Sequence, residues 1–305
     1  MSASGFYSIS KMLFAGLFIT GLISACSQQP AVDPKKNVDA QPKPDDGKAP
    51  IEFAKLKVGK CTLLGDVREF NDDAISLQDL SDATLCMLGD GMGGVSNGKV
   101  GGQVAAERAF AAMGRELKKN LTKTATTDEA RDAVRRALVA ANAEVIELSK
   151  DPDLKNCGTT IVLALFRQGH DGVLIAGIGD SRIYHVKDAA IEQLTIDHSL
   201  AQALVDNKTI TPAEAKTHRF RNVLWKYLGS KEVGDNPEVK HVPLRTGERL
   251  LLCTDGLHGV VTDDRILDKM KQIRDVQQCA DALCKLAITS GSRDNVSCLV
   301  IEPID

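Results

Sequence analysis

The sequence predicts an α+β fold, in a chain long enough for one large domain or two small ones, and three observations support this interpretation. Short runs of aliphatic and β-branched residues recur along the chain, as is typical of strands. Two long amphipathic helical patterns separate the first of these runs from the second. The chain has 305 residues, 43% hydrophobic and 26% charged, which is ordinary for a globular protein. A formal net charge of −3 without a basic stripe argues against nucleic acid as a partner.

The N-terminus has the pattern of a targeting segment. Lys11 precedes the apolar run MLFAGLFITGLIS at residues 12–24, which is shorter than the ~20 residues of a membrane-spanning helix and suits a signal-peptide core. The run leads to Cys26 in a pattern that resembles the lipobox of bacterial lipoproteins. We therefore expect a signal peptide at residues 1–25, a lipid anchor on Cys26, and a place on the periplasmic or extracellular face of a bacterial membrane. An uncleaved anchor is the alternative.

Residues 26–50 are rich in Pro, Lys, Asp and Gln and have almost nothing to bury, so they predict a flexible linker. The folded domain is expected over residues 51–305. Strands are predicted in chain order at residues 83–88, 159–166, 173–178, 182–186, 248–254 and 296–302. Helices are predicted at residues 102–121, 128–149 and 276–289.

Two capping boxes support the helix assignments. One runs from Thr126 to Glu129 at the start of the second long helix. The other, from Thr211 to Glu214 with a proline between them, marks a helix inside the polar insertion at residues 199–229. Insertions of this kind often form flaps beside a functional site.

Seven cysteines follow Cys26 at unrelated spacings, and no C-x-x-C motif pairs with another. Zinc is therefore not indicated. Cys86, Cys253 and Cys298 lie inside apolar strand-like runs, so we interpret these thiols as small core residues. Proteins of oxidising compartments usually pair their cysteines in disulfides, so this cysteine pattern is unusual for an exported protein.

Four aspartates occur where apolar strand-like runs end or begin: Asp90 in TLCMLGDG, Asp180 in VLIAGIGDS, Asp255 in LLLCTDG, and Asp294 in SGSRDN before the last run. Each alone is a common turn residue. Together they predict one cluster, because strands of one sandwich place their ends at a shared rim. Carboxylates ~4 Å apart would repel by roughly 4 kcal/mol at an effective dielectric of ~20. Bound magnesium or manganese would remove that conflict.

A further charged segment, GDVREFNDDAI, carries Arg68 followed by Asn71, Asp72 and Asp73. Arginine is suited to bidentate contact with phosphate oxygens. The alternative for Arg68 is an ordinary ion pair with Asp72 or Asp73.

The glycine-rich stretch at residues 85–106 allows three interpretations. Its glycines satisfy G-x-G-x-x-G from Gly89, but Asp90 inside the loop would repel a pyrophosphate. Residues 93–99 fit most of a P-loop, but Val100 stands where Ser or Thr would hold magnesium. In the third interpretation, the glycines let the backbone turn so that Asp90 and a nearby carbonyl hold a hard cation.

The order of the motifs resembles the bacterial PP2C-type (PPM) serine/threonine phosphatases from about residue 61 to residue 302. The matching motifs are GDVREFNDDA, LGDGMGG, GTT, GIGDSRIY, LTIDHSL, LLCTDGL and SRDNVS. The resemblance implies a β-sandwich of two antiparallel sheets flanked by helices on both sides, with residues 199–229 as a flap. It also implies a centre of two Mg²⁺ or Mn²⁺ ions at one rim, and we expect a monomer.

The resemblance also implies residue roles. Asp90 would bridge the two ions, the carbonyl of Gly91 would ligate one of them, and Asp255 and Asp294 would ligate the other. Asp180 would hold a third, weaker metal.

In the same resemblance, Asp72 and Asp73 would act mostly through metal-bound waters, and Arg68 would hold the phosphoryl group. Asp72 stands where the family usually has Glu. Met92 replaces a histidine that animal members use as a proposed proton donor, so the general acid is unassigned. His198 and His218 are interpreted as structural or flap residues.

The predicted function is hydrolysis of phosphoserine and phosphothreonine in phosphorylated proteins by hydroxide held between two metals, without a phosphoenzyme. The alternative is a catalytically silent regulatory or binding module of the same fold, anchored to the membrane. The retained acids argue against that alternative. A nucleotide-binding enzyme that uses the glycine stretch is a second alternative.

Overall fold

The computed structural model describes residues 55–96 and 99–304. All of these residues fall within one compact unit, Ala49–Asp305. The predicted signal peptide, Cys26, the linker and the expected domain start at Ile51 lie outside the described residues. None of the described helices is both long enough and apolar enough to cross a bilayer.

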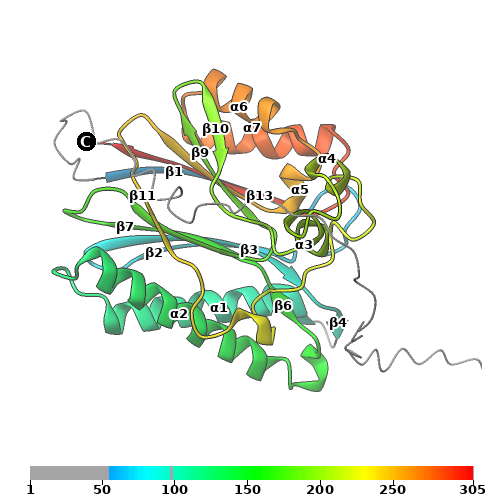
Figure 1. Cartoon of the computed structure of the whole chain (residues 1–305), viewed down its shortest axis with the longest axis horizontal. Coiled ribbons are helices and arrows are strands. Elements are labelled where there is room, and N and C mark those ends of the chain that lie inside the picture. Colours follow the sequence, from blue (N-terminus) through cyan, green and yellow to red (C-terminus); the bar gives the residue numbers. More distant parts are fainter. Residues whose placement is uncertain (1–54, 97–98, 305) are drawn as a thin grey trace, which may run out of the picture. The chain divides into compact units, whose positions relative to one another are not determined.

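Two antiparallel sheets form the centre of the domain (Figure 1). One is five-stranded, in the order β1 (Lys55–Leu63), β13 (Val296–Ile304), β12 (Arg249–Cys253), β9 (Arg182–Lys187) and β10 (Ala190–Gln193). The other is six-stranded, in the order β11 (Lys240–Val242), β8 (Val173–Ile178), β7 (Ile161–Arg167), β3 (Ala83–Met92) and β2 (Asp73–Asp79), with β6 (Gly158–Thr159) also on β3. A two-stranded ribbon joins β4 (Val95–Ser96) and β5 (Lys99–Val100).

Helices cover the outer face of each sheet (Figure 1). The six-stranded sheet packs against α1 (Gly101–Asn120) and α2 (Thr127–Leu148). The five-stranded sheet packs against α5 (Asp255–His258), α6 (Asp263–Gln272) and α7 (Val276–Thr289). The insertion holds α3 (Leu200–Asp206) and α4 (Pro212–Ala215), and short 3₁₀ turns lie at Pro152–Leu154 and Lys231–Val233.

Three hydrophobic cores follow from these four layers. The middle core joins the inner faces of the two sheets through residues such as Leu88, Val162 and Leu299. The outer cores lie under α1 and α2, and under α5 to α7. Both predicted capping boxes are present, at Thr126 with Glu129 and at Thr211 with Glu214. The predicted class, an antiparallel sandwich flanked by helices, is confirmed.

Several predicted bounds were too short, and some elements were not predicted. β3 runs on to Met92 rather than ending at residue 88, because it stays paired through its glycines. The unpredicted elements include β1, β2, β4, β5, β10, β11, α5 and α6. They are short, polar or edge segments, in which the hydrophobic period is weak.

The cysteines behave mostly as predicted. All seven after Cys26 are free, and six of them are buried, while Cys61 is partly exposed. Register places Cys61 and Cys253 on either side of Cys298 across three neighbouring strands. The Sγ of Cys284 on α7 lies 3.6 Å from the Sγ of Cys298. Burial raises the pKa of the Cys253 thiol, so this side chain stays protonated in the core.

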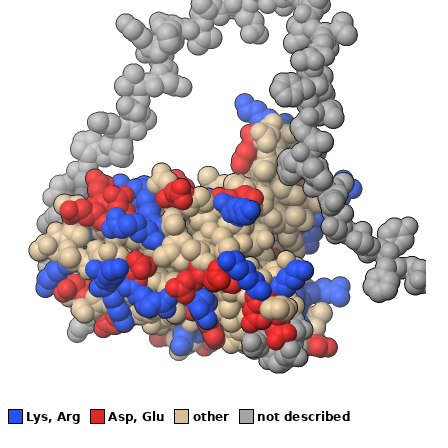
Figure 2. Space-filling view, turned by 90° about the horizontal axis from the view of Figure 1, so that it is seen from below, with Lys and Arg blue, Asp and Glu red and all other residues tan. Residues whose placement is uncertain are grey.

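Charged side chains of both signs are interspersed on the face that carries α1 and α2 (Figure 2). Part of this mixture consists of pairs one helical turn apart on α2, at 2.6 Å for Arg131 with Asp128 and 2.7 Å for Arg135 with Asp132. Such exposed pairs contribute little to stability, ~0.3–0.5 kcal/mol each.

Close backbone contact between β1 and α7 requires a glycine at position 59. A Cβ added to Gly59 would lie 2.0 Å from the carbonyl oxygen of Val276, which is backbone and cannot rotate away. We expect Gly59→Ala to lower the free energy of unfolding by about 1–3 kcal/mol, because β1 must separate from α7. Urea denaturation measures this change. Gly94→Ala is the control, because a Cβ there meets nothing within 4 Å; an equal loss in both variants would contradict the explanation.

Candidate metal centre

Asp73 and Asp90 face each other across two strands. β2 begins at Asp73, and its register with β3 places Asp73 directly opposite Asp90. Directly paired residues of antiparallel strands have Cβ atoms ~5 Å apart on one face of the sheet. The prediction that Asp90 ends its strand was wrong, because β3 continues past it to Met92.

The glycines of β3 allow backbone to approach from both sides. A Cβ on Gly91 would lie 2.3 Å from the carbonyl carbon of Gly102 in α1, and a Cβ on Gly89 would lie 2.7 Å from the carbonyl oxygen of Thr160. The glycine-rich stretch therefore fits close packing of β3 beneath the first turn of α1. Asp72 lies at that turn. Burial raises its pKa, while hydrogen bonds with the backbone of Gln103 and Gly102 oppose the rise.

Asp180 lies in the turn between β8 and β9, and each residue of this turn is held by a different element. The backbone N–H of His198 donates to the carbonyl of Gly179 at 2.9 Å. The imidazole Nε2 of His258 on α5 lies 3.0 Å from the carbonyl oxygen of Asp180. The hydroxyls of Ser181 and Thr160 are 2.7 Å apart. The turn that carries Asp180 is therefore fixed on three sides.

Asp255 and Asp73 are connected through the end of β12. Asp255 is the first residue of α5 and directly follows Thr254. The hydroxyl of Thr254 donates to Asp73 Oδ2 at 3.1 Å and accepts from the backbone N–H of Ser297 at 3.1 Å. A buried threonine thus joins the five-stranded sheet to the carboxylate at the start of β2.

Asn295 holds the loop between β1 and β2 against the start of β13. Its Nδ2 donates to the carbonyls of Leu64 at 2.9 Å and Phe70 at 3.0 Å, and its Oδ1 accepts from the backbone N–H of Asp72 at 2.9 Å. Both ends of the loop that carries Arg68 are therefore fixed beside Asp294.

Arg68 pairs with an acid that was not predicted as its partner. Its Nη2 lies 2.7 Å from Asp294 Oδ2, with half of the arginine side chain exposed. The alternative interpretation as a pair with Asp72 or Asp73 was wrong in its partner, because the turn of the loop brings Arg68 to the start of β13. Burial acts to lower the pKa of Arg68, but the hydrogen bond and charge of Asp294 outweigh it and raise that pKa.

The insertion at residues 199–229 is tied to the strand that carries Asp90. Thr159 and Leu228 exchange backbone hydrogen bonds of 3.1 and 2.9 Å, and the Thr159 hydroxyl donates to the carbonyl of Asp90 at 3.1 Å. Asn142 on α2 holds the same end, because its Oδ1 accepts from Gly229 N at 2.7 Å and its Nδ2 donates to the carbonyl of Ser230 at 3.0 Å. The end of the insertion therefore lies beside the strand that carries Asp90.

Burial of several carboxyl groups together makes their ionisation costly. Burial raises the pKa of Asp73 to about 7, and the charge of Asp255 adds to this effect. Burial raises the pKa of Asp180 to about 8, again with a contribution from Asp255. The pKa of Asp90 lies well above its usual range because of burial and then the charge of Asp73.

Asp255 shows that these carboxyls interact directly. Burial and the charge of Asp294 raise its pKa, while a hydrogen bond with the Asp90 side chain lowers it. The five acids Asp73, Asp90, Asp180, Asp255 and Asp294 therefore form one electrostatic group, which we call the acid centre.

The donor atoms of this region suit a hard divalent cation. Among the described residues, three buried carboxylate oxygens accept no hydrogen bond, namely Asp72 Oδ1, Asp73 Oδ1 and Asp255 Oδ1. An unpaired buried carboxylate oxygen is costly, and a cation removes the cost. Every donor is oxygen, which favours Mg²⁺ or Mn²⁺ over zinc. No three His, Cys, Asp or Glu side chains of the described residues already surround a single metal position, so the fit rests on donor chemistry and on the unpaired oxygens.

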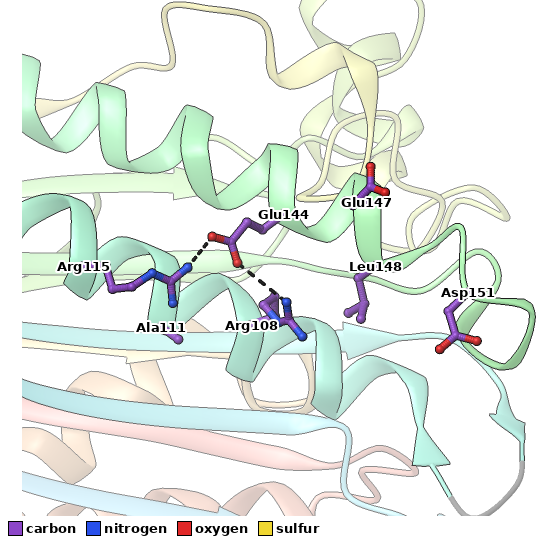
Figure 3. A pocket seen from close by; sticks show the side chains of 7 residues that line it. All are labelled: Arg108, Ala111, Arg115, Glu144, Glu147, Leu148 and Asp151. Carbon is purple, nitrogen blue, oxygen red and sulfur yellow. Dashed lines mark hydrogen bonds and ion pairs between the residues drawn. The ribbon is translucent and has the colours of Figure 1, made fainter.

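The hollows lined by described residues include two that lie outside the acid centre. One of about 580 Å³ lies between α1 and α2, where Arg115 and, at 3.9 Å, Arg108 both face Glu144 (Figure 3). This ion-pair bridge links the two helices and contacts none of the five acids. A second hollow of about 240 Å³ lies beside the insertion and includes Trp225 and His198 in its lining.

Comparison with known proteins agrees with this geometry. Residues 66–287 match the family model described as Protein phosphatase 2C. The chain belongs to the protein phosphatase 2C family. The serine/threonine protein phosphatase PstP of Mycobacterium tuberculosis is 35% identical over 249 residues, which cover 79% of this chain and 44% of PstP. The chain thus matches less than half the length of that relative. The serine/threonine phosphatase stp of Listeria monocytogenes is 31% identical over 242 residues, covering 78% of this chain and 92% of the relative.

Solved structures of the protein phosphatase 2C family show the same fold. The crystal structure of the Mycobacterium tuberculosis phosphatase PstP/Ppp has a TM-score of 0.69 at 32% identity, covering 82% of this chain and 99% of that structure. Another structure, of the PstP catalytic domain in complex with 2 manganese ions, has a TM-score of 0.67 at 32% identity and covers 82% of this chain and 99% of that one.

The neutral residues that hold the acids were not predicted from the sequence. Thr254 stands in the motif LLCTDGL next to Asp255, and Asn295 stands in SRDNVS next to Asp294. Their position beside an acid was the available signal. Thr160 also stands in a quoted motif, GTT. His258 gave no signal, because a single histidine three residues after an aspartate is not a motif.

The raised carboxyl pKa values predict a pH dependence of stability when a chelator removes divalent cations. The folded state keeps protons on Asp73 and Asp180 up to about pH 7 and 8, whereas the unfolded chain releases them near the ordinary value of 3.8. The folded state therefore binds more protons within this window, and the free energy of unfolding should fall as the pH rises from about 4 to 8. Urea denaturation at pH 5 and pH 8 in EDTA measures the fall.

Asp73→Asn should reduce this pH dependence, because an amide does not ionise. Asp268→Asn, on the exposed side of α6, is the control and should leave it unchanged. A free energy of unfolding that rises between pH 5 and pH 8 in the wild type would contradict the burial argument.

Proposed function

We propose that this member of the protein phosphatase 2C family hydrolyses phosphoserine and phosphothreonine monoesters of proteins, acting as a monomer. The observation that carries the proposal is the acid centre, in which five carboxyls from separate parts of the chain interact and buried oxygens lack partners. The names of the curated relatives, serine/threonine phosphatases of two bacteria, support the same activity.

The proposed cofactor is a pair of Mn²⁺ or Mg²⁺ ions, as the manganese complex of the related PstP domain suggests. Asp90, Asp255 and Asp294 would hold these ions together with the carbonyl of Gly91. Bound ions of this kind lower the pKa of water and stabilise negative charge on phosphoryl oxygens.

Three further acids complete the proposed ligand set. Asp73 would contribute Oδ1, because Thr254 already donates to Oδ2. Asp72 and Asp73 would act mainly through water. Asp180 would form a third, weaker site beside Asp255, whose charge affects its pKa.

Arg68 is the proposed phosphate ligand of the chain. Its guanidinium carries N–H donors in a planar fork that matches two phosphoryl oxygens. Half of the side chain is exposed, and its ion pair with Asp294 holds it at the edge of the acid centre. Charge that develops on phosphoryl oxygens during hydrolysis would be met by this guanidinium.

The direct test is manganese-dependent hydrolysis of p-nitrophenyl phosphate by the full chain. We expect Asp90→Asn and Asp255→Asn each to lower kcat by at least ~100-fold, because each removes a charge that holds the cations. Asp268→Asn should retain wild-type activity, since that side chain lies exposed on α6. Activity that persists in EDTA, or in Asp90→Asn, would exclude the proposed mechanism.

The same measurements test the two alternative functions. A folded wild-type chain that binds Mn²⁺ but hydrolyses neither p-nitrophenyl phosphate nor a phosphopeptide would be the silent binding module. Tight nucleotide binding that survives EDTA would favour the nucleotide-binding enzyme.

We further propose that the chain is a lipoprotein anchored through Cys26, on the periplasmic or extracellular face of a bacterial membrane. The apolar run at residues 12–24 followed by Cys26 supports this location. We expect metabolic labelling with palmitate in the wild type and its loss in Cys26→Ser, with Cys61→Ser as the control. Label retained in Cys26→Ser, or a mature protein that keeps Met1, would refute the anchor.

A further inference from the structure

Most of the well-exposed large apolar side chains belong to two segments whose backbones contact residues next to the acid centre. The described residues have eight such side chains. Three belong to the loop between β1 and β2 and form what we call the loop patch: Leu64, Val67 and Phe70. Four belong to the flap or the segment leading into it and form what we call the flap patch: Ile196, Leu200, Val223 and Trp225. The eighth, Leu77, lies on β2 outside both patches.

The loop patch borders the acid centre on the side of Arg68. Val67 and Phe70 are 51% and 44% exposed, on either side of Arg68 in the chain. Asn295, next to Asp294, fixes both ends of this loop through the carbonyls of Leu64 and Phe70. These apolar side chains therefore stay in water beside the residue proposed to hold the phosphoryl group.

The flap patch borders the acid centre on the side of Asp180. The backbone N–H of Trp225 donates to the carbonyl of His198 at 3.0 Å, and the backbone N–H of His198 donates to that of Gly179, next to Asp180. The backbone N–H of Leu200 donates a hydrogen bond of 2.8 Å to the carbonyl of Val223. Trp225 is 40% exposed and its ring meets the His198 ring edge-on, 5.3 Å between centroids.

Two residues of the flap patch, Ile196 and Trp225, also line a hollow. It measures about 240 Å³, and Ile196, His198 and Trp225 are among its lining residues. Pockets that enclose whole small-molecule ligands are ~300–1,000 Å³. A hollow of this size suits one side chain rather than a complete ligand.

Both patches lie on segments that are fixed beside the acid centre, where a phosphorylated residue would react. Exposed apolar clusters of this kind mark sites where another surface binds, and a tryptophan is a frequent source of binding energy. We propose that the loop patch and the flap patch bind the substrate polypeptide, selecting phosphoserine or phosphothreonine segments with apolar residues on both sides. This inference rests on the proposed phosphatase activity and names the class of its substrate. Because the segments of both patches are fixed beside the acid centre, a polypeptide whose phosphoryl group reacts there would contact them.

The test compares substrates that do and do not reach the patches. The full chain with Mn²⁺ is assayed on p-nitrophenyl phosphate and on two phosphothreonine peptides of equal length and charge, one with Leu and Phe on both sides of the phosphoresidue and one with Ser and Gln. We expect kcat/KM to be about tenfold higher for the apolar peptide, mainly through KM, because its flanking side chains leave water. Equal kcat/KM for the two peptides would overturn the inference.

Variants locate the effect on the surface. Trp225→Ser and Val67→Ser should each lower kcat/KM for the apolar peptide by about tenfold, while p-nitrophenyl phosphate hydrolysis stays unchanged. Unchanged hydrolysis of the small ester also shows that each variant is folded. Leu77→Ser is the matched control, because Leu77 is 42% exposed but lies outside both patches; it should leave all three substrates unaffected. An equal loss in Leu77→Ser would overturn the assignment.

Failure of peptide selection and failure of the phosphatase activity give different results. A wild-type chain that fails to hydrolyse p-nitrophenyl phosphate would overturn the proposed activity and this inference with it, whereas normal hydrolysis with equal peptides would overturn this inference alone. Sedimentation that shows a dimer in the wild type and a monomer in Trp225→Ser would assign the patches to a second copy of the chain, and would also overturn it.

Discussion

The main physical constraint on this structure is that the fold holds several buried carboxyl groups close together, although their negative charges repel one another. Asp73 and Asp90 stand opposite each other in a strand register, so they cannot separate without unpairing β2 from β3. Two unit charges ~5 Å apart repel by about 3 kcal/mol at an effective dielectric of ~20. Burial is the largest cause of the raised pKa values of Asp73, Asp90 and Asp180, and the charges of neighbouring carboxyls raise these pKa values further. A centre of this kind is tolerated because cations or protons neutralise it.

Neutral residues hold the acids where charges alone would push them apart. Thr254 donates a hydrogen bond to Asp73. The side chain of Asn295 donates two hydrogen bonds to backbone carbonyls of the loop before Asp72 and accepts one from the backbone N–H of Asp72. Glycines at positions 91 and 102 let β3 and α1 approach without side chains between them. These contacts use short side chains and backbone, which have little rotamer freedom to lose. The sandwich therefore supplies rigidity, and the carboxyls supply the chemistry.

Exposed apolar side chains lie on segments whose backbones are fixed beside the acid centre. The loop from β1 to β2 and the stems of the flap are fixed at their backbones by Asn295, Thr159 and the contact of His198 with Gly179. Their side chains are then free to face water, and Val67 and Trp225 do so. A phosphoryl group bound by charge and a polypeptide bound by apolar contact would use neighbouring but separate parts of one rim.

The sequence by itself determined the elements with strong patterns and the identity of the acids. Helices α1, α2 and α7 followed from their period and caps, and Asp90, Asp180, Asp255 and Asp294 from their places beside apolar runs. Only the tertiary structure decided which groups meet. Arg68 forms an ion pair with Asp294, Asp73 lies opposite Asp90 in the strand register, and the free thiols of Cys284 and Cys298 are in contact. Each contact joins residues from separate elements. Such contacts depend on the order and register of the strands. Local periodicity does not encode strand order or register, because each side-chain pattern fits several ways of pairing the same strands.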